Sequence, residues 1–254
     1  MSKIIAFTNQ KGGVGKTTSS QCFGLGLIEQ GKKVLFVDLD QQCSLSLVLG
    51  VPKGTEPNVF DVLLGEVPIK KAIHKMPKFD VLPASPSLTN ADKVITEVGK
   101  EFRLKEAIDP IRHDYDFIIL DCPPNLGILT IIALAAADEV IIPTQASILE
   151  FSSVEEFGKT FKIVKKYVNP GLVLSGLLLC KHNPRTTLAK ELGELTRDMA
   201  EEMGTKLFET TIRSSIKMNE AQTLKENLFH YAPNSTVAQD YTDFVNEYLK
   251  GEKR

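Results

Sequence analysis

Short apolar runs alternate with longer amphipathic segments along most of the chain. Several runs are apolar at every position, which is typical of parallel strands covered on both faces. The strand-like runs are Ile4–Phe7, Val34–Val37, Phe79–Leu82, Phe117–Leu120, Val140–Ile142 and Leu172–Leu179, with a short one expected near Lys206–Phe208. The clearest helical patterns are Ser152–Tyr167, Thr187–Met203 and Thr236–Leu249, and Leu126–Ala137 is expected to be a buried helix. This alternation predicts an α/β fold: a doubly wound, mostly parallel sheet with helices on both faces.

Proline and glycine are most frequent between Val51 and Asn90, where we expect short helices around a strand. No internal repeat, low-complexity tract or flexible linker interrupts the pattern. Many α/β sheets of this length form one unit. We therefore expect residues 1–254 to form a single domain.

The composition and net charge of the chain limit the kinds of partner that it can attract as a whole. The chain is 43% apolar and has a net charge of −2, so it has no overall attraction to nucleic acid or to anionic membranes. Any such binding must come from a local patch or from dimerisation. The longest apolar stretch, Leu126–Ala137, is shorter than the roughly 20 residues that span a bilayer. The four cysteines are far apart and predict reduced, mostly buried thiols in a cytoplasmic protein: Cys22, Cys43, Cys122 and Cys180.

A glycine-rich segment follows the first expected strand and leads into a helical pattern. It consists of Gln10, Lys11, Gly12, Gly13, Val14, Gly15, Lys16, Thr17 and Thr18. This is the arrangement of a phosphate-binding loop, in which glycines let backbone N–H groups converge on an anion and the helix N-terminus adds partial positive charge. Lys16 can reach the β- and γ-phosphates, and Thr17 can hold Mg²⁺. The segment predicts a nucleoside triphosphate and Mg²⁺ as ligands.

Two later strands end in aspartates. Val34–Val37 leads to Asp38 and Asp40, which strand alternation places on the same side of the chain. Phe117–Leu120 leads to Asp121, as in a Walker B motif, whose carboxylate holds Mg²⁺ through water. Ligands of open α/β sheets bind at this carboxyl end of the strands. The alternative for Asp38 and Asp40 is that they only cap the following helix.

The phosphate-binding loop departs from the standard pattern by carrying a second lysine, Lys11. In this respect it resembles the deviant Walker A motif, KGGxGK[ST], of the ParA/MinD superfamily of ATPases. The segment 34–42 is similar to the family's switch I motif, hhhDxDxQ, and the segment 121–124 (Asp-Cys-Pro-Pro) is similar to its switch II. Residues 140–145 and 211–221 match the family in order and spacing. The resemblance runs from residue 3 to about residue 250.

The resemblance implies an ATPase with a defined set of site residues. Two ATP molecules would be buried between two monomers, and Lys11 of each monomer would cross to the partner's nucleotide. Lys16 would hold the β- and γ-phosphates, and Asp40 would orient the attacking water. Asp38 would support the site and its magnesium shell. Lys11, Lys16 and Asp40 are therefore the expected catalytic residues, and the metal would be held by Thr17, Asp38 and Asp121.

The resemblance also assigns adenine contacts, to Asn183 and Arg213. Two departures from the family bear on this assignment. Ser215 stands where many relatives have asparagine, and the segment 180–183 (Cys-Lys-His-Asn) differs from the usual base-facing loop. Asn183 precedes a proline, so the alternative is that it only forms a turn.

Within the superfamily, the forms of the two switch motifs favour a ParA-type DNA-segregation ATPase. Such a protein dimerises with ATP, binds DNA without sequence preference and is stimulated by a ParB-type partner, so the resemblance implies nucleoid association in the ATP state. The candidate phosphate contacts are Arg185, Lys190, Arg197 and Lys217. The alternative for each is an ordinary solvated surface charge.

Two other members of the superfamily are alternatives. A MinD-like ATPase would position a division site and bind membrane through a C-terminal amphipathic helix, but the tail here has mixed charges, and its apolar residues are expected to be core contacts: Val237, Tyr241, Phe244 and Leu249. An electron-transfer protein like the nitrogenase iron protein would hold a cluster between two subunits. Neither Cys43, after switch I, nor Cys122, in the Walker B turn, fits the ligand positions of that family.

Overall fold

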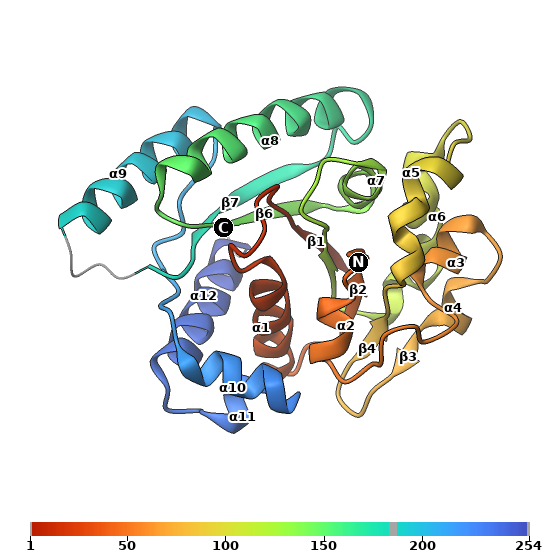
Figure 1. Ribbon diagram of the computed structural model, residues 1–254, viewed down its shortest axis with the longest axis horizontal. Helices are drawn as coiled ribbons and strands as arrows, with labels where there is room; N and C mark the ends of the chain where they lie inside the picture. The colour runs from red at the N-terminus through yellow and green to blue at the C-terminus, as the bar shows by residue number, and fades with distance from the viewer. Residues whose placement is uncertain (1, 183–186, 253–254) are drawn as a thin grey trace.

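The computed structural model describes residues 2–182 and 187–252, and its centre is a seven-stranded sheet with the order β3-β4-β2-β5-β1-β6-β7 (Figure 1). The strands are β1 (Lys3–Phe7), β2 (Val34–Asp38), β3 (His74–Lys75), β4 (Asp80–Leu82), β5 (Phe117–Asp121), β6 (Glu139–Thr144) and β7 (Val173–Leu179). Neighbouring strands are parallel except β3 and β4. The predicted mostly parallel sheet is confirmed.

Helices cover both faces of the sheet, and each face has its own apolar core. One face packs against α1 (Lys16–Glu29), α2 (Ser44–Val48), α10 (Ile216–Leu224), α11 (Leu228–Tyr231) and α12 (Thr236–Glu252). The other packs against α3 (Val59–Leu64), α4 (Ile69–Ala72), α5 (Ala91–Val94), α6 (Arg103–Ile108), α7 (Ile128–Ala136), α8 (Ile148–Tyr167) and α9 (Thr187–Glu202). Short 3₁₀ turns span Pro86–Asn90, Lys100–Phe102 and Asp109–Asp114. The doubly wound arrangement follows from strands whose side chains are apolar on both faces.

Two expectations about strands need correction. The strand expected near Lys206–Phe208 is wrong: Leu207 forms only an isolated parallel bridge with Leu177, and Ile212 forms a second isolated bridge with Cys180, directly after β7. The chain therefore pairs along this side of the sheet through two separate bridges instead of a continuous β-ladder. The segment 51–90 contains β4 as expected. It also contains the short antiparallel strand β3, which could not be predicted because its sequence has no apolar run.

The register of the central strands brings the predicted acidic residues to one level. Asp121, the last residue of β5, is the register partner of Asp38 on β2 and of Phe7 on β1. The phosphate-binding loop leaves β1 directly after Phe7. Since all three strands are parallel, the loop and both carboxylates lie at the carboxyl edge of the sheet, where α/β folds bind ligands.

The C-terminal helix α12 is part of the core. Val237, Tyr241 and Phe244 are buried, Leu249 is partly buried against the same apolar core, and the Phe244 ring packs against Phe23 of α1. The expectation that the apolar residues of this helix are core contacts is confirmed. Across the described residues, none of the helices combines the length and apolar character needed to cross a bilayer.

Candidate nucleotide-binding site

The phosphate-binding loop connects β1 to α1 and is held by its neighbours. Asn9 donates a hydrogen bond from Nδ2 to the Pro143 carbonyl at 2.8 Å and accepts one from the Lys11 N–H at 3.0 Å. Gly13 (φ +76°) and Gly15 (φ +107°) adopt left-handed backbone conformations that strain residues with a Cβ atom. The glycines at these two positions therefore permit the tight curl that a phosphate-binding loop requires.

Lys16 is the first residue of α1 and is only 7% exposed. Its ammonium group donates to the Lys11 carbonyl oxygen at 3.1 Å, so its charge lies against the inner side of the loop. A buried ammonium at the N-terminus of a helix is a strong attractor for an anion, because the helix dipole and the loop amides act in the same direction. This is where the β- and γ-phosphates of a nucleotide would lie.

Thr17 and Ser20 join α1 to the Walker B aspartate. The Thr17 hydroxyl donates to Oδ2 of Asp121 at 2.8 Å, and the Ser20 hydroxyl donates to Oδ1 at 3.0 Å. The two hydroxyls lie on one face of α1 because they are three residues apart. Both oxygens of a fully buried carboxylate are thereby engaged.

Asp38 holds the backbone that follows β2. Its carboxylate is fully buried and accepts hydrogen bonds from the Ser46 N–H at 2.8 Å, the Ser46 hydroxyl at 2.7 Å and the Asp40 N–H at 3.1 Å. The Ser46 hydroxyl in turn accepts from the Ala84 N–H at 3.0 Å, beyond β4. One of these donors, the Ser46 N–H, belongs to the first turn of α2, so the contacts of Asp38 agree with the alternative that it caps the following helix.

Asp40 is 8% exposed and accepts a hydrogen bond at Oδ1 from the Gln42 N–H at 2.9 Å. This is a short Asx turn that fixes the carboxylate two residues beyond the end of β2. Asp38 therefore holds the surrounding backbone through several hydrogen bonds, whereas Asp40 makes fewer contacts and lies farther out from the sheet.

The surroundings of the two buried carboxylates, Asp38 and Asp121, shift their pKa values. Burial raises the pKa of Asp121, and the neighbouring Asp38 carboxylate raises it further, whereas Thr17, Ser20 and the Lys16 ammonium oppose the shift. Burial likewise raises the pKa of Asp38, against the hydrogen bonds from Ser46. A divalent cation between these carboxylates and the Thr17 hydroxyl would offset the burial and the repulsion and favour the ionised carboxylates, and all three groups supply the oxygen ligands that a small divalent cation prefers.

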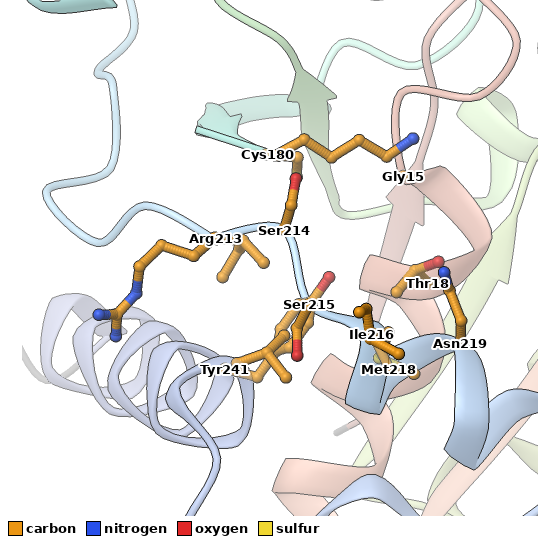
Figure 2. A pocket seen from close by; sticks show the side chains of 13 residues that line it. Gly15, Thr18, Cys180, Arg213, Ser214, Ser215, Ile216, Met218, Asn219 and Tyr241 are labelled. Carbon is orange, nitrogen blue, oxygen red and sulfur yellow. The ribbon is translucent and has the colours of Figure 1, made fainter. Parts of the chain in front are cut away.

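A cavity of about 420 Å³ opens beside the loop (Figure 2). Its walls combine apolar side chains with a few hydroxyl and amide groups; the lining residues include Gly15, Thr18, Cys180, Lys181, Ile212, Ser214, Ser215, Ile216, Met218, Asn219, Val237 and Tyr241. The volume and the mixture of apolar and polar groups suit a nucleoside. Ser215, at the departure from the family pattern, caps α10 by accepting from the Lys217 N–H at 3.2 Å.

The two expected adenine contacts have different outcomes. Arg213 borders the cavity, but its side chain points away from it toward α12 (Figure 2). There its Nε donates to Oδ2 of Asp240 at 3.0 Å, and its backbone N–H donates to the same oxygen at 2.9 Å. The guanidinium is thus directed to a structural ion pair and not to the cavity. Asn183 lies outside the described residues.

The three candidate DNA contacts among the described residues are not gathered in one place. Lys190 is exposed on α9, and Arg197, on the same helix, forms an ion pair with Glu209 at 2.9 Å. Lys217, on α10, forms an ion pair with Glu220 at 2.9 Å. The helices α9 and α10 pack on opposite faces of the sheet. Arg185 lies outside the described residues.

The sequence interpretation missed several groups that contact the loop. Gln222 of α10 donates from Nε2 to the Thr18 hydroxyl at 3.3 Å, and Gln145 and Lys181 both donate to the Gly13 carbonyl. Ser20 could have been found, because it follows Thr17 by three residues on a predicted helix. The other three lie far from the loop in sequence, and no local spacing connects them to it.

Comparisons with known proteins agree with this site. The family model described as an AAA domain matches residues 2–174. The chain is 36% identical over 251 residues to the sporulation initiation inhibitor protein Soj of Bacillus subtilis, covering 97% of this chain and 98% of that protein. It is 35% identical to the chromosome-partitioning ATPase Soj of Treponema pallidum, covering 98% of each chain.

Solved structures share the fold. A structure named cobyrinic acid a,c-diamide synthase from Mycobacterium smegmatis, with bound ADP and magnesium, has a TM-score of 0.87 and 33% identity and covers 100% of this chain and 96% of that chain. The cell division ATPase MinD of Pyrococcus furiosus has a TM-score of 0.80 and 27% identity, covering 98% of this chain and 99% of that chain. The motifs, the sheet and the full-length relatives agree: the chain belongs to the ParA/MinD family of P-loop ATPases, among the Soj and ParA partitioning proteins.

Proposed function

We propose that this protein is an ATP-dependent dimeric switch ATPase for the segregation of a chromosome or plasmid. In its ATP state it would bind DNA without sequence preference, and a ParB-type partner would stimulate hydrolysis. The observation that carries the proposal is the junction of Lys11, Lys16, Thr17 and Asp121 at the carboxyl edge of the sheet, in a chain whose full-length relatives are named as partitioning proteins.

The site fits ATP with Mg²⁺. The nucleoside would occupy the cavity between the end of β7 and the start of α10, and the phosphates would lie along the loop toward Lys16. Thr17, Asp121 and Asp38 are the residues that would hold Mg²⁺, and their oxygen donors are the ones this ion prefers. Bound there, the ion neutralises charge that develops on the β- and γ-phosphate oxygens.

Hydrolysis requires groups that this chain places at the end of β2 and in the loop. Asp40 lies beyond Asp38 at the carboxyl edge and is held by its Asx turn, so its carboxylate can orient a water molecule without losing its own position. Lys11 adds a second positive charge to the loop, and we propose that it acts on the nucleotide of the partner subunit. Hydrolysis by the isolated monomer is then slow, because the site is complete only in the dimer.

DNA binding follows from dimerisation. A monomer of net charge −2 has no general attraction to phosphate, but a dimer presents two sets of local cations to one duplex. Of the four candidates, Lys217 and Arg197 already have carboxylate partners, so their contribution must include the cost of weakening an ion pair. Among the candidates that the structure describes, Lys190 is therefore the strongest.

The alternative positioning function, like that of MinD, has less support. A membrane-seeking C-terminal helix needs an accessible apolar face, whereas α12 uses Tyr241, Phe244 and Tyr248 in the core. Glu247 of the same helix accepts hydrogen bonds from the N–H groups of Glu209 and Thr210. The helix is thus fixed on both its apolar and its polar sides.

The name of the mycobacterial structure suggests a third activity, amide synthesis. One way to supply the nitrogen of an amide is to release ammonia from an amide donor with an accessible cysteine thiolate as nucleophile. All four cysteines of this chain are buried, and burial raises the pKa of Cys22, Cys122 and Cys180. The thiols lack the exposure and the low pKa that this chemistry requires, so we do not extend the activity to this protein.

Dimerisation is the direct test of the switch. Asp40→Ala should bind ATP, fail to hydrolyse it and accumulate as a dimer, since the phosphate contacts remain. Lys11→Ala should bind ATP and stay monomeric. Light scattering after size exclusion, with ATP and with ADP, measures both variants beside the wild type. A Lys11→Ala protein that dimerises as the wild type does would contradict the action of Lys11 across the interface.

A further inference from the structure

The Gly13 carbonyl is held by two side chains from outside the loop. The Lys181 ammonium donates to it at 2.7 Å, and Gln145 donates to it from Nε2 at 3.2 Å. Gln145 directly follows β6, and Lys181 follows β7 after one residue. Two adjacent strands of the sheet thus send one donor each to a single backbone oxygen of the phosphate-binding loop.

The backbone around Lys181 is fixed in a way that directs this side chain. The preceding residue, Cys180, donates its N–H to the Thr144 carbonyl at 2.7 Å, and the following residue, His182, donates its N–H to the Ile212 carbonyl at 3.0 Å. Between these two anchors Lys181 has φ +52°, a left-handed conformation that costs free energy for any residue with a Cβ atom. The chain therefore holds Lys181 in an unfavourable backbone conformation while its side chain reaches the loop.

The consequence for the loop follows from peptide geometry. A trans peptide unit is planar, and its C=O and N–H groups point in opposite directions. A Gly13 carbonyl that is held on the side of β6 and β7 therefore leaves the Val14 N–H directed away from them, available to an anion in the loop. Because Gly13 has φ +76° and no Cβ atom, rotation of this peptide has little steric hindrance. A reversed peptide would present an oxygen to the phosphates.

We infer that Lys181 is a positioning residue of the nucleotide site: through a charge-assisted hydrogen bond it holds the Gly13–Val14 peptide in the orientation that binds phosphate, with Gln145 as the weaker second donor. The inference rests on the proposed ATPase function. It also gives a role to the stretch beginning at Cys180, where the sequence departs from the family pattern. Lys181 also lines the nucleoside cavity, so one side chain joins the two halves of the site.

Substitution of Lys181 with methionine keeps the length of the side chain and removes the donor. For Lys181→Met we expect ATP to bind about tenfold more weakly, the size of effect expected for loss of one hydrogen bond from a charged group. The KM for ATP should rise by a similar factor, and kcat should change less than about twofold, because the group does not touch the reacting atoms. Lys181→Arg should restore most of the affinity, since the guanidinium can donate to the same carbonyl.

The matched control is Lys225→Met. Lys225 is also an exposed lysine with a left-handed backbone (φ +57°), but it lies at the C-terminus of α10 and has no part in the proposed site. A second control, Lys181→Gly, removes the donor and the backbone strain together. It should weaken ATP binding as Lys181→Met does while leaving the unfolding temperature unchanged or raised. A purely structural role for Lys181 would instead lower the unfolding temperature of both variants.

The ¹³C chemical shift of the Gly13 carbonyl provides a readout without nucleotide, because it responds to the hydrogen bonds that this oxygen accepts. In Lys181→Met the shift should differ from the wild-type value, because the shorter of the two hydrogen bonds is lost, and Lys225→Met should leave it unchanged. Wild-type ATP affinity together with a wild-type Gly13 carbonyl shift in Lys181→Met would overturn the inference, as would an equal loss of affinity in Lys225→Met. Failure of the wild-type protein to bind ATP would instead count against the proposed function, and the carbonyl shift would still decide the inference.

Discussion

The Thr17 hydroxyl donates a 2.8 Å hydrogen bond to Oδ2 of Asp121, which joins the first turn of α1 to the last residue of β5. The two residues are 104 positions apart in sequence, and the sheet register brings them together. The same carboxylate accepts from Ser20 on its other oxygen. A cation that approaches Thr17 therefore meets a carboxylate whose orientation is already fixed, which reduces the reorganisation needed to form the metal site.

From this contact we predict that Thr17→Ala abolishes the effect of Mg²⁺ on ATP affinity. In the wild type, removal of Mg²⁺ by a chelator should weaken ATP binding at least about tenfold, because the phosphate charge is no longer neutralised. Thr17→Ala should bind ATP with the same weak affinity with and without Mg²⁺, and Thr17→Ser should behave as the wild type. Calorimetric titrations in both conditions measure this, and a full magnesium response in Thr17→Ala would contradict the assignment.

Lys16→Ala should lose ATP binding and keep the fold. The Lys16 ammonium is the buried cation of the loop, and it donates a hydrogen bond to the Lys11 carbonyl, within the loop itself. The change should therefore alter the free energy of unfolding by less than about 1 kcal/mol. Urea unfolding followed by circular dichroism, together with a calorimetric titration, separates the two effects. Undiminished ATP affinity would refute the phosphate role.

Replacement of Asp38 and of Asp40 by alanine should have different effects on the free energy of unfolding and on hydrolysis. Asp38→Ala leaves the buried donors of Ser46 without their acceptor and should cost about 2–4 kcal/mol of unfolding free energy. Asp40→Ala loses one hydrogen bond from Gln42 and should cost about 1 kcal/mol while abolishing hydrolysis. Asp38→Asn, which keeps an acceptor, is the control and should recover most of the stability. Equal losses in Asp38→Ala and Asp40→Ala would contradict the structural assignment.

The surroundings of Glu139, at the end of the sheet opposite the site, predict that the stability of the protein depends on pH. Burial opposes its ionisation, but hydrogen bonds from Lys3, Ser175 and Tyr248 outweigh burial and lower the pKa of Glu139. A carboxylate with a lowered pKa in the folded state stabilises the protein above the ordinary pKa of about 4.3, and this contribution is lost as the pH falls through the folded-state pKa. Glu139→Gln should therefore cost about 1–3 kcal/mol at neutral pH.

Urea unfolding of Glu139→Gln and of the exposed control Glu156→Gln, as a function of pH, tests this prediction. The difference between Glu139→Gln and the wild type should shrink as the pH drops below about 4.3. ATP affinity at neutral pH should be unaffected, because Glu139 begins β6, at the end opposite the site. A difference that is constant over the whole pH range would show that the Glu139 hydrogen bonds do not depend on its charge.

The central motifs could be predicted from sequence because each is contiguous. Strand, glycine-rich loop and helix follow one another in the phosphate-binding loop, and the apolar run before Asp121 fixes the end of β5. The contacts between motifs could not be predicted. Gln145 and Lys181 reach the Gly13 carbonyl from 132 and 168 positions away, and a backbone acceptor leaves no complementary side chain in the sequence.

Charge partners explain why three of the expected basic residues are less available to a ligand than their sequence positions predict. Arg213 was expected at the base, but Asp240 of α12 lies beside it and accepts its hydrogen bonds. Glu220 follows Lys217 by three residues on a helix, a spacing that predicts their ion pair, whereas Arg197 and Glu209 are brought together only by the fold. Local periodicity identifies a basic residue, and tertiary packing decides whether its charge is available to a ligand.

Charge reversal on α9 should distinguish available from paired cations. We predict that Lys190→Glu weakens DNA binding more than Arg197→Glu, since Arg197 is already neutralised by Glu209. Each phosphate contact that is lost should lower the slope of log affinity against log salt by about one. Fluorescence anisotropy over a salt series measures the slopes, and ATP affinity is the control that should not change. A larger effect of Arg197→Glu would reverse the assignment.

The most direct test of the account is DNA binding by the Asp40→Ala dimer. With ATP, this variant should bind two duplexes of unrelated sequence with equal affinity, and the affinity should fall steeply as salt rises, because the contacts are to phosphates. With ADP, binding should be weak, because a monomer presents only one set of cations. If the ATP-bound Asp40→Ala dimer produces no mobility shift of plain duplex DNA at low salt, segregation by this mechanism is wrong.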